Sequence, residues 1–238
     1  GSDLPDSVFP NNWVTFHENG TAITYPMFAP TRRKERSEDF LNQIAQGFKI
    51  EKRIKFEEYE GQNLFLEGTG SMILDRQNQI VYACISPRTD KKLLKKFCEL
   101  TDYEVVVFHS VDEKGEDIYH TNVMMALGEN FVVICLDTVK DEDEKSKLVE
   151  SFTKTNKEII EITFEQVLAF AGNMLQVRNK EGKTFLVMSE QAFNSLTEEQ
   201  IAQIEKHTHI LYSAIPTIET YGGGSARCMM AEVFLSSI

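Results

Sequence analysis

One thiol, one imidazole and one carboxylate stand at comparable points of this chain, each just ahead of an apolar run. They are Cys228, His120 and Glu67. A thiolate is a strong nucleophile, a nearby histidine can protonate a leaving amine, and a carboxylate can hold a nitrogen-rich planar group. If the fold brings them together, the three suit attack on an amidine or urea carbon.

The cysteines are not equivalent. A single cysteine beside an apolar strand is usually a core residue, and Cys98 and Cys135 fit that interpretation. Cys228 differs because residues 222–225, Gly-Gly-Gly-Ser, precede it and leave backbone amides unobstructed. Arg227 adds positive charge that favours a thiolate. We therefore expect Cys228 to be the reactive thiol, with a core role as the alternative.

The histidine and the carboxylate also have simpler explanations. His120 follows the acidic turn Asp112 to Asp117, so it is either a surface histidine or part of a site. Glu67 lies between an apolar run and the glycine turn Gly68 to Gly70, where an ordinary turn residue is the alternative. The shared position of these residues ahead of strands favours the site.

Two other motifs carry no chemistry in this interpretation. The triple glycine at 222–224 precedes an expected strand and so lacks a helix N-terminus for phosphate. His207 and His209 have metal-like spacing, but no cysteine or carboxylate cluster accompanies them. The sequence therefore predicts no metal site.

Strands and helices alternate along the chain, which predicts an α/β fold. The expected strands are 13–16, 22–25, 71–74, 80–85, 105–108, 123–127, 131–136, 174–177, 185–188, 210–212 and 229–234. The expected helices are 36–45, 91–100, 142–154, 164–170 and 197–206.

These elements recur in a fixed order of strand, turn, strand, helix and strand. The first strands begin near Trp13, Met72, Met124, Met174 and Met229, which are 50 to 59 residues apart. A period of this size is typical of a radial array, so the sequence predicts a five-unit α/β propeller in one domain spanning residues 1–238. The first strands then converge on the axis, and the polar residues ahead of them meet at one pole.

The fifth unit is incomplete in this prediction. The stretch from Met229 contains only a first strand, and the segment before Trp13 supplies neither helix nor strand. We therefore expect a stretch of roughly 50 residues, ahead of Gly1, to complete the ring.

Composition and charge exclude several classes of protein. The chain has 238 residues, of which 42% are hydrophobic and 26% charged, as in folded soluble proteins. Its net charge of −12 repels a phosphate backbone, so we expect no nucleic-acid partner. No apolar run is long enough to span a bilayer, so no membrane partner is expected. Four widely spaced cysteines fit reduced thiols and a cytoplasmic location.

Several motifs, taken in order, resemble a known family. Residues 4–9, Leu-Pro-Asp-Ser-Val-Phe, and residues 29–35, Ala-Pro-Thr-Arg-Arg-Lys-Glu, look like the N-terminal half of dimethylarginine dimethylaminohydrolase. Residues 66–68, 86–90, 119–120 and 222–228 resemble later motifs of the arginine deiminase and amidinotransferase superfamily. The resemblance runs from about Asp3 to the C-terminus. It implies the pentein fold, a five-unit α/β propeller, and a covalent thiol mechanism without a cofactor.

The resemblance also implies roles for individual residues. Cys228 matches the nucleophile, His120 the general acid and base, and Glu67 a carboxylate that contacts the planar substrate head. Asp6 matches a substrate-head contact, while Arg32 and Arg88 match arginines that hold the substrate α-carboxylate. An arginine fork suits that bidentate contact. The implied partner is a small amino-acid substrate, and a homo-oligomer is left open.

One departure bears on substrate choice. Dimethylarginine hydrolases carry Glu-Asp where this chain has Asn11 and Asn12. A guanidinium cation favours carboxylates, whereas a neutral ureido group is better matched by amides that donate and accept. This form resembles a branch of the family associated with citrulline, so we expect hydrolysis of citrulline to ornithine. The alternatives are an arginine deiminase or dimethylarginine hydrolase, then an amidinotransferase or a non-catalytic amino-acid-binding module.

Overall fold

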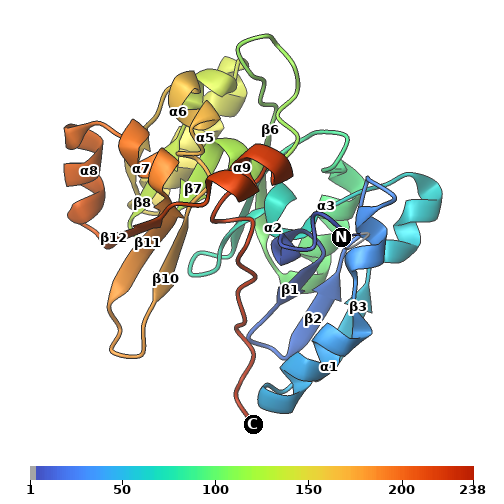
Figure 1. Ribbon diagram of the computed structural model, residues 1–238. Helices are drawn as coiled ribbons and strands as arrows, with labels where there is room; N and C mark the ends of the chain where they lie inside the picture. The colour runs from blue at the N-terminus through green and yellow to red at the C-terminus, as the bar shows by residue number, and fades with distance from the viewer. Residues whose placement is uncertain (1–3) are drawn as a thin grey trace.

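The computed structural model describes residues 4–238, which form four repeated units (Figure 1). Residues 1–3, where the predicted domain and the resemblance begin, lie outside the described residues. Each unit contains one three-stranded sheet, in which the first strand is antiparallel to the second and the second is parallel to the third. In order along the chain, the strands are β1 (Val14–Phe16), β2 (Thr21–Thr24), β3 (Lys52–Lys55), β4 (Ile73–Asp75), β5 (Ile80–Cys84), β6 (Glu104–Phe108), β7 (Met125–Leu127), β8 (Phe131–Ile134), β9 (Glu158–Glu161), β10 (Leu175–Arg178), β11 (Thr184–Ser189) and β12 (His209–Ser213).

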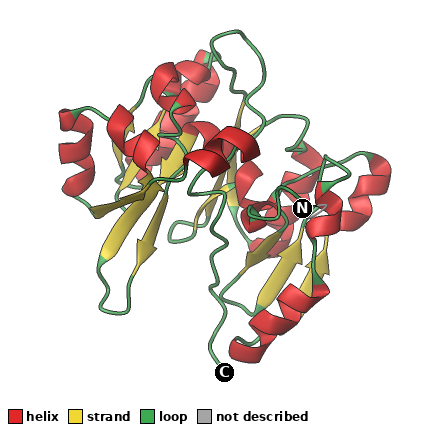
Figure 2. Cartoon of the chain, viewed as in Figure 1, coloured by secondary structure: helices red, strands yellow, loops and turns green. Residues whose placement is uncertain are grey.

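Helices connect the second and third strands of every unit, because parallel strands need a crossover connection. These helices are α1 (Glu38–Gly47), α3 (Lys91–Thr101), α5 (Glu142–Lys154) and the pair α7 (Glu190–Ser195) and α8 (Glu198–Glu205). Of these, α1 and α8 lie at opposite edges of the molecule (Figure 2). The remaining helices are α2 (Gly68–Ser71), α4 (Thr121–Met124), α6 (Phe164–Leu168) and α9 (Pro216–Gly222), with 3-10 turns η1 (Pro10–Asn12), η2 (Arg32–Glu35), η3 (Glu57–Gln62) and η4 (Leu136–Thr138).

The α/β class and the repeated order of elements are confirmed in four units. The sequence missed β3 and β9, the third strands of units one and three, because their Lys, Arg and Glu residues conceal the strand pattern. It also assigned Ser71 to a strand, whereas Ser71 closes the short helix α2.

The strand expected at 229–234 is wrong: Met229 lies in a turn, and residues 230–234 belong to no strand. This segment runs between the sheets of units one and four (Figure 1). Its continuation joins unit one, where Lys49 donates its backbone N–H to the Ser236 carbonyl. The fifth unit stays a prediction, because the strands of residues 4–238 make four sheets.

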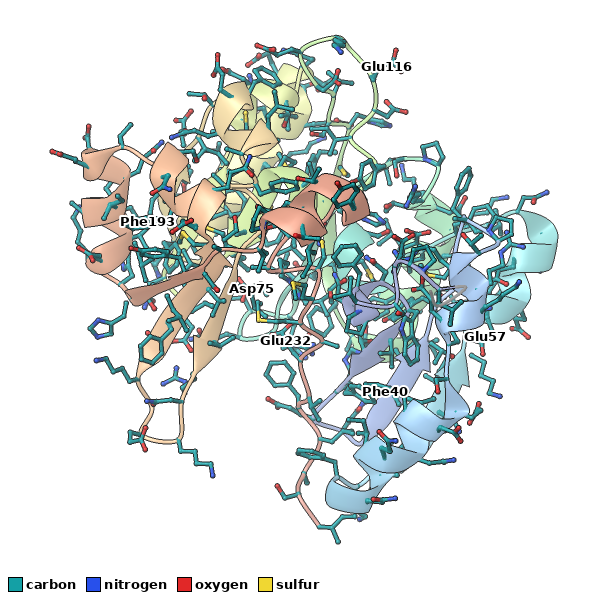
Figure 3. All side chains as sticks on the ribbon, viewed as in Figure 1. Phe40, Glu57, Asp75, Glu116, Phe193 and Glu232 are labelled. Carbon is teal, nitrogen blue, oxygen red and sulfur yellow. The ribbon has the colours of Figure 1, made fainter. Side chains whose placement is uncertain are left out.

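The hydrophobic core lies between consecutive units. Along β8, Phe131 and Val133 pack toward unit four, while Val132 and Ile134 pack toward unit two. Successive side chains of a strand point to opposite faces, so a strand covered on both faces reads as an uninterrupted apolar run. Figure 3 shows Phe40 and Phe193 in the units at opposite sides of the molecule.

The last sheet is less well covered than the others. Leu211 and Tyr212 of β12 are exposed, whereas the second and third sheets are packed against helices of the units that follow them. Unit four thus presents a strand face with exposed apolar side chains.

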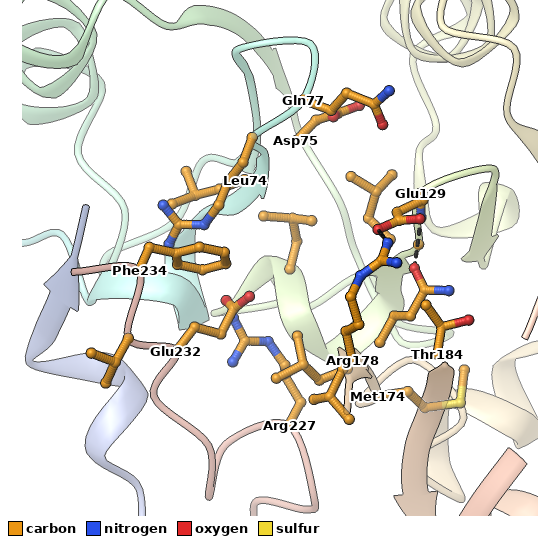
Figure 4. A pocket seen from close by; sticks show the side chains of 18 of the residues that line it. Leu74, Asp75, Gln77, Glu129, Met174, Arg178, Thr184, Arg227, Glu232 and Phe234 are labelled. Atoms are coloured by element: carbon orange, nitrogen blue, oxygen red, sulfur yellow. Dashed lines mark hydrogen bonds and ion pairs between the residues drawn. The ribbon is translucent and has the colours of Figure 1, made fainter. Parts of the chain in front are cut away.

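The first strands of neighbouring units lie side by side, β4 with β7 and β7 with β10. Their N-terminal ends and the segments ahead of them carry the predicted site. Their opposite ends line a cavity of about 840 Å³, together with Arg227, Glu232 and Phe234 of the C-terminal segment (Figure 4). Within residues 4–238, no helix has both the length and the apolar character needed to cross a membrane.

Candidate active site

The short helix α2 brings the segments of the site together. Glu67 is its N-cap residue, and Gly68 and Gly70 let other segments of the chain approach closely. Gly68 has a φ of +46°, and a Cβ there would lie 2.4 Å from the Asn11 carbonyl oxygen. A Cβ on Gly70 would lie 2.3 Å from Asn12 Nδ2 and 2.9 Å from His120 Nδ1. The glycine turn therefore lets Asn12 and His120 share one space.

Glu67 is fully buried and ionised. Its Oε1 accepts the Phe28 backbone N–H at 2.8 Å, and its Oε2 accepts from His120 Nε2 at 2.7 Å and faces Arg88 Nη1 at 3.5 Å. Burial by itself raises a carboxyl pKa, but the hydrogen bond and charge of His120, with Arg88, outweigh it and lower the pKa of Glu67 to about 2. An ordinary turn residue would be solvated, so that alternative is wrong.

His120 caps α4 and is 4% exposed, which excludes a surface histidine. Burial lowers its pKa, and the hydrogen bond to Glu67 opposes this only in part. Because the Glu67 carboxylate only accepts, the neutral imidazole carries its proton on Nε2, and Nδ1 faces the space beside Asn12. A neutral imidazole with a free Nδ1 can take up and return a proton.

Asn11 and Asn12 are buried in η1 with amide atoms that have no partner. Both side-chain atoms of Asn11, and Nδ2 of Asn12, make no hydrogen bond. Whichever way the Asn11 amide is turned, it offers one donor and one acceptor. Unpaired buried polar atoms are costly, so these amides are candidates for hydrogen bonds to a bound polar group.

Arg32 lies behind Asn12 and is occupied by the protein itself. Its Nη1 donates to Asn12 Oδ1 at 2.7 Å, and its Nε and Nη2 donate to the Glu35 carboxylate at 2.9–3.2 Å. Nη2 also donates to the backbone carbonyls of Phe9 and Asp6. In this arrangement Arg32 orients Asn12, and its fork is not open to a substrate carboxylate.

Arg88 is the more accessible arginine. Its guanidinium lies 4.8 Å from the ring centroid of Tyr119 and 5.8 Å from that of Phe28, both exposed aromatic residues. The three residues line a cavity of about 440 Å³, together with Pro87 and the loop residues 115–117. Figure 3 shows Glu116 on this loop. Asp6 is half-buried, and the structure places its backbone carbonyl, rather than its carboxylate, on Arg32.

Cys228 approaches the same region through amide contacts. Its Sγ accepts from Asn173 Nδ2 at 3.2 Å and from Asn122 Nδ2 at 3.5 Å, and its side chain is nearly buried. Asn122 lies two residues after His120, the N-cap of α4, so an amide of this helix contacts the thiol.

The other thiols lie in apolar surroundings. Burial raises the pKa of Cys84 to about 12 and those of Cys98 and Cys135 to about 11. At neutral pH such thiols are almost entirely protonated and therefore react slowly. All four cysteines are free.

Arg227 adds positive charge near the thiol, as the sequence suggested, because its guanidinium interacts electrostatically with Cys228, but its hydrogen bonds go elsewhere. Its guanidinium donates to the Met230 carbonyl and to Glu232 at 3.3 Å, on the side of the large cavity (Figure 4). The polar hydrogens at Cys228 Sγ come from amides instead. In the described part of the chain, no three His, Cys, Asp or Glu residues cluster in a way that could hold a metal ion.

Sequence reasoning missed Asn122 and Asn173. Asn173 directly precedes the predicted strand start at Met174, just as Cys228 directly precedes the one at Met229, and Glu67 and His120 lie a few residues ahead of theirs. The same rule, applied to unit four, would have found it.

The model of the family described as N,N dimethylarginine dimethylhydrolase, eukaryotic, matches residues 1–235. The chain belongs to this family. It is therefore a hydrolase of the pentein superfamily that acts on non-peptide carbon–nitrogen bonds of arginine derivatives. No curated protein matches the chain in sequence.

Solved structures share the fold at low identity. The N-terminal domain of ArgZ, an arginine dihydrolase from the ornithine-ammonia cycle in cyanobacteria, superposes with a TM-score of 0.74 at 17% identity, over 99% of this chain and 79% of that one. A variant of that domain covalently bonded to a reaction intermediate gives a TM-score of 0.76 at 16% identity, with the same coverage. A dimethylarginine dimethylaminohydrolase variant with an S-methyl-L-thiocitrulline adduct gives 0.65 at 17% identity, over 96% and 77% of the two chains.

Proposed function

We propose that this protein hydrolyses the ureido group of citrulline to give ornithine, with Cys228 as the nucleophile. The observation that carries the proposal is the set of unpartnered amide atoms on Asn11 and Asn12, which lie beside the bonded pair of Glu67 and His120. A neutral ureido head has one carbonyl acceptor and several N–H donors, so it can satisfy these amides without adding a charge.

The reaction needs one nucleophile and one group that moves protons. The Cys228 thiolate attacks the ureido carbon, and the bond from that carbon to the ornithine δ-nitrogen breaks as His120, holding the thiol proton, protonates the nitrogen. Water, deprotonated by His120, then attacks the carbamoyl thioester and releases carbamate, which decomposes to ammonia and carbon dioxide. Glu67 keeps the imidazole oriented and stabilises its protonated form.

Support for covalent catalysis comes from proteins of the same fold. The ArgZ domain is named as covalently bonded to a reaction intermediate, and the dimethylarginine dimethylaminohydrolase as an adduct with S-methyl-L-thiocitrulline. In this chain, Arg88 is the arginine that remains open to the substrate α-carboxylate.

A guanidinium substrate is the second candidate. Glu67, with its pKa lowered to about 2, keeps a negative charge in the site, which a cationic head would neutralise. Arginine or a methylated arginine would then give citrulline, or ornithine after a second hydrolysis.

The proposal predicts a preference that can be reversed. The native protein should have a higher kcat/KM for citrulline than for arginine, because a buried guanidinium with too few counter-charges carries an uncompensated desolvation cost. The double change Asn11→Glu with Asn12→Asp should lower activity on citrulline and raise binding or turnover of arginine. If the native protein prefers arginine, the guanidine alternative replaces the citrulline assignment.

The five-unit ring belongs to this proposal as well. The exposed Leu211 and Tyr212 of β12 support a further unit beside unit four, because helices of following units cover the second and third sheets. A structure of the active enzyme in which both side chains remain in solvent would contradict it.

A further inference from the structure

Asn173 occupies a junction between three parts of the site. It follows α6 and immediately precedes Met174 and β10, and its side chain is 2% exposed. Nothing in the reaction as described above uses this residue. A buried amide beside the thiol can nevertheless affect how the sulfur is positioned.

Every polar atom of the Asn173 side chain is engaged. Nδ2 donates to Cys228 Sγ at 3.2 Å and to the Asn122 carbonyl at 2.9 Å, and Oδ1 accepts the Arg227 backbone N–H at 3.1 Å. One planar group thus contacts the nucleophilic sulfur, the peptide just before it, and the helix α4 that begins after His120.

We propose that Asn173 is the positioning residue of the nucleophile: it holds the Cys228 sulfur against α4 and donates a hydrogen bond that favours the thiolate. The inference rests on the proposed function, since it takes Cys228 as the attacking group. An N–H donor stabilises an anionic sulfur more than a neutral thiol, so this contact strengthens as the thiol loses its proton.

The chemistry of the site requires an amide here. A carboxylate of the same shape would lose both donors and place a negative charge about 3 Å from the developing thiolate, at the distance of the present contact. An alanine would remove the contacts without adding charge. Asn122 is the weaker partner, because its Nδ2 lies at 3.5 Å and its Oδ1 has no hydrogen bond.

The experiment measures the reactivity of Cys228 without substrate. Native protein and the variants Asn173→Asp, Asn173→Ala and Asn122→Ala are treated with iodoacetamide at fixed pH, and alkylation of each cysteine is followed by peptide mass spectrometry, with half-buried Cys98 as the internal reference. Asn194→Asp makes the same chemical change at an exposed position of unit four and serves as the control. Far-ultraviolet circular dichroism and the melting temperature report folding.

The expected result is a graded loss. In both Asn173 variants Cys228 should be alkylated at least about tenfold more slowly. A factor of ten corresponds to about 1.4 kcal/mol, which is within what a hydrogen bond to a charged group contributes. Asn122→Ala should lose less, and Asn194→Asp should stay within about twofold of native protein. kcat should fall in parallel with the alkylation rate while KM changes little, because Asn173 acts through Cys228.

Two results would overturn the inference: native alkylation rates in a folded Asn173 variant, or a larger loss in Asn122→Ala than in Asn173→Ala. If Asn173→Asp does not fold, the alkylation rate of Asn173→Ala decides. If neither Asn173 variant folds, and Cys228 of Asn122→Ala is alkylated at the native rate, the role of Asn173 is structural and the inference fails as well. The proposed function fails separately, if citrulline is not turned over while the reactivity of Cys228 still depends on Asn173.

Discussion

The strand β4 has a buried carboxylate near each end, and both reach into unit three. Glu67, ahead of the strand, accepts from His120 at 2.7 Å. Asp75, its last residue, contacts Lys157 Nζ at 3.0 Å. At the far end the partners are complete: Lys157 also donates to two backbone carbonyls, and Asn78 donates to Asp75.

The difference separates a structural contact from a chemical one. The Asp75 contact joins two units through a lysine and leaves both groups with hydrogen-bond partners. The Glu67 contact ends in an imidazole that can gain or lose a proton, beside amides on Asn11 and Asn12 with no partner. We infer that Glu67 serves catalysis because unpaired amide atoms lie beside its contact with His120, whereas Asp75 serves stability because both groups of its contact have hydrogen-bond partners.

Removing the charge of Glu67 should produce the largest effect on activity. Glu67→Gln can still contact His120 but no longer stabilises its protonated form, so kcat/KM should fall by about 10²–10⁴ while the fold persists. The matched control is Glu144→Gln, since Glu144 accepts from the exposed His109 at 3.0 Å. Steady-state kinetics with citrulline would measure both, and equal activity of the two variants would remove Glu67 from the mechanism.

Breaking the far-end pair should act on stability instead. Lys157→Met leaves Asp75 buried without its cation, which should lower the free energy of unfolding by about 3–5 kcal/mol. Denaturant titration would measure this, and the activity per folded molecule should be retained. Lys206→Met, which breaks an exposed pair with Glu158, should cost less than about 1 kcal/mol. Similar costs for both variants would contradict the structural role of Lys157.

The burial of His17 should also make the stability of the protein sensitive to acid. His17, just after β1, has its pKa lowered to about 3 by burial and by the charge of Arg76. Between pH 6.5 and 3 the unfolded chain therefore binds the proton that the folded protein excludes, and the free energy of unfolding should fall by about 1.4 kcal/mol per unit as pH drops. Denaturation at several pH values should show a shallower loss in His17→Gln, whereas identical slopes would contradict this assignment.

Removing the positive charge of Arg88 should produce the smallest of these effects. If Arg88 holds the α-carboxylate, Arg88→Met should lower kcat/KM for the amino-acid substrate by about ten- to a hundredfold. A decarboxylated analogue should be a poor substrate of native protein by a similar factor and should be little affected by the change. An equal loss on both substrates would place Arg88 elsewhere in the reaction.

The sequence predicted more of the contacts at the Glu67 end of β4 than of those at its Asp75 end. Glu67 and His120 were grouped because both stand ahead of first strands, and the structure places them in contact. The engagement of Arg32 by Glu35 depends on the 3-10 turn η2, which contains both residues, and was not predicted. The pairing of Asp75 with Lys157 depends on how units two and three pack, which no periodic pattern encodes.

The fold shows the same boundary. Apolar runs such as β8 were found because both faces of the strand are buried, whereas the charged β3 and β9 were missed. The apolar run at 229–234 has strand composition but no partner strand, and composition alone does not make a sheet.

The most direct test of the central claim is intact-protein and peptide mass spectrometry during turnover of citrulline, with arginine, dimethylarginine and agmatine in parallel. Our account predicts ornithine as the product, a carbamoyl adduct on Cys228 trapped by acid quenching, and neither in Cys228→Ser, while Cys98→Ser behaves as native protein. Citrulline turnover by Cys228→Ser, or an adduct on another cysteine, would contradict the nucleophile. Turnover of arginine or dimethylarginine with none of citrulline would contradict the ureido assignment.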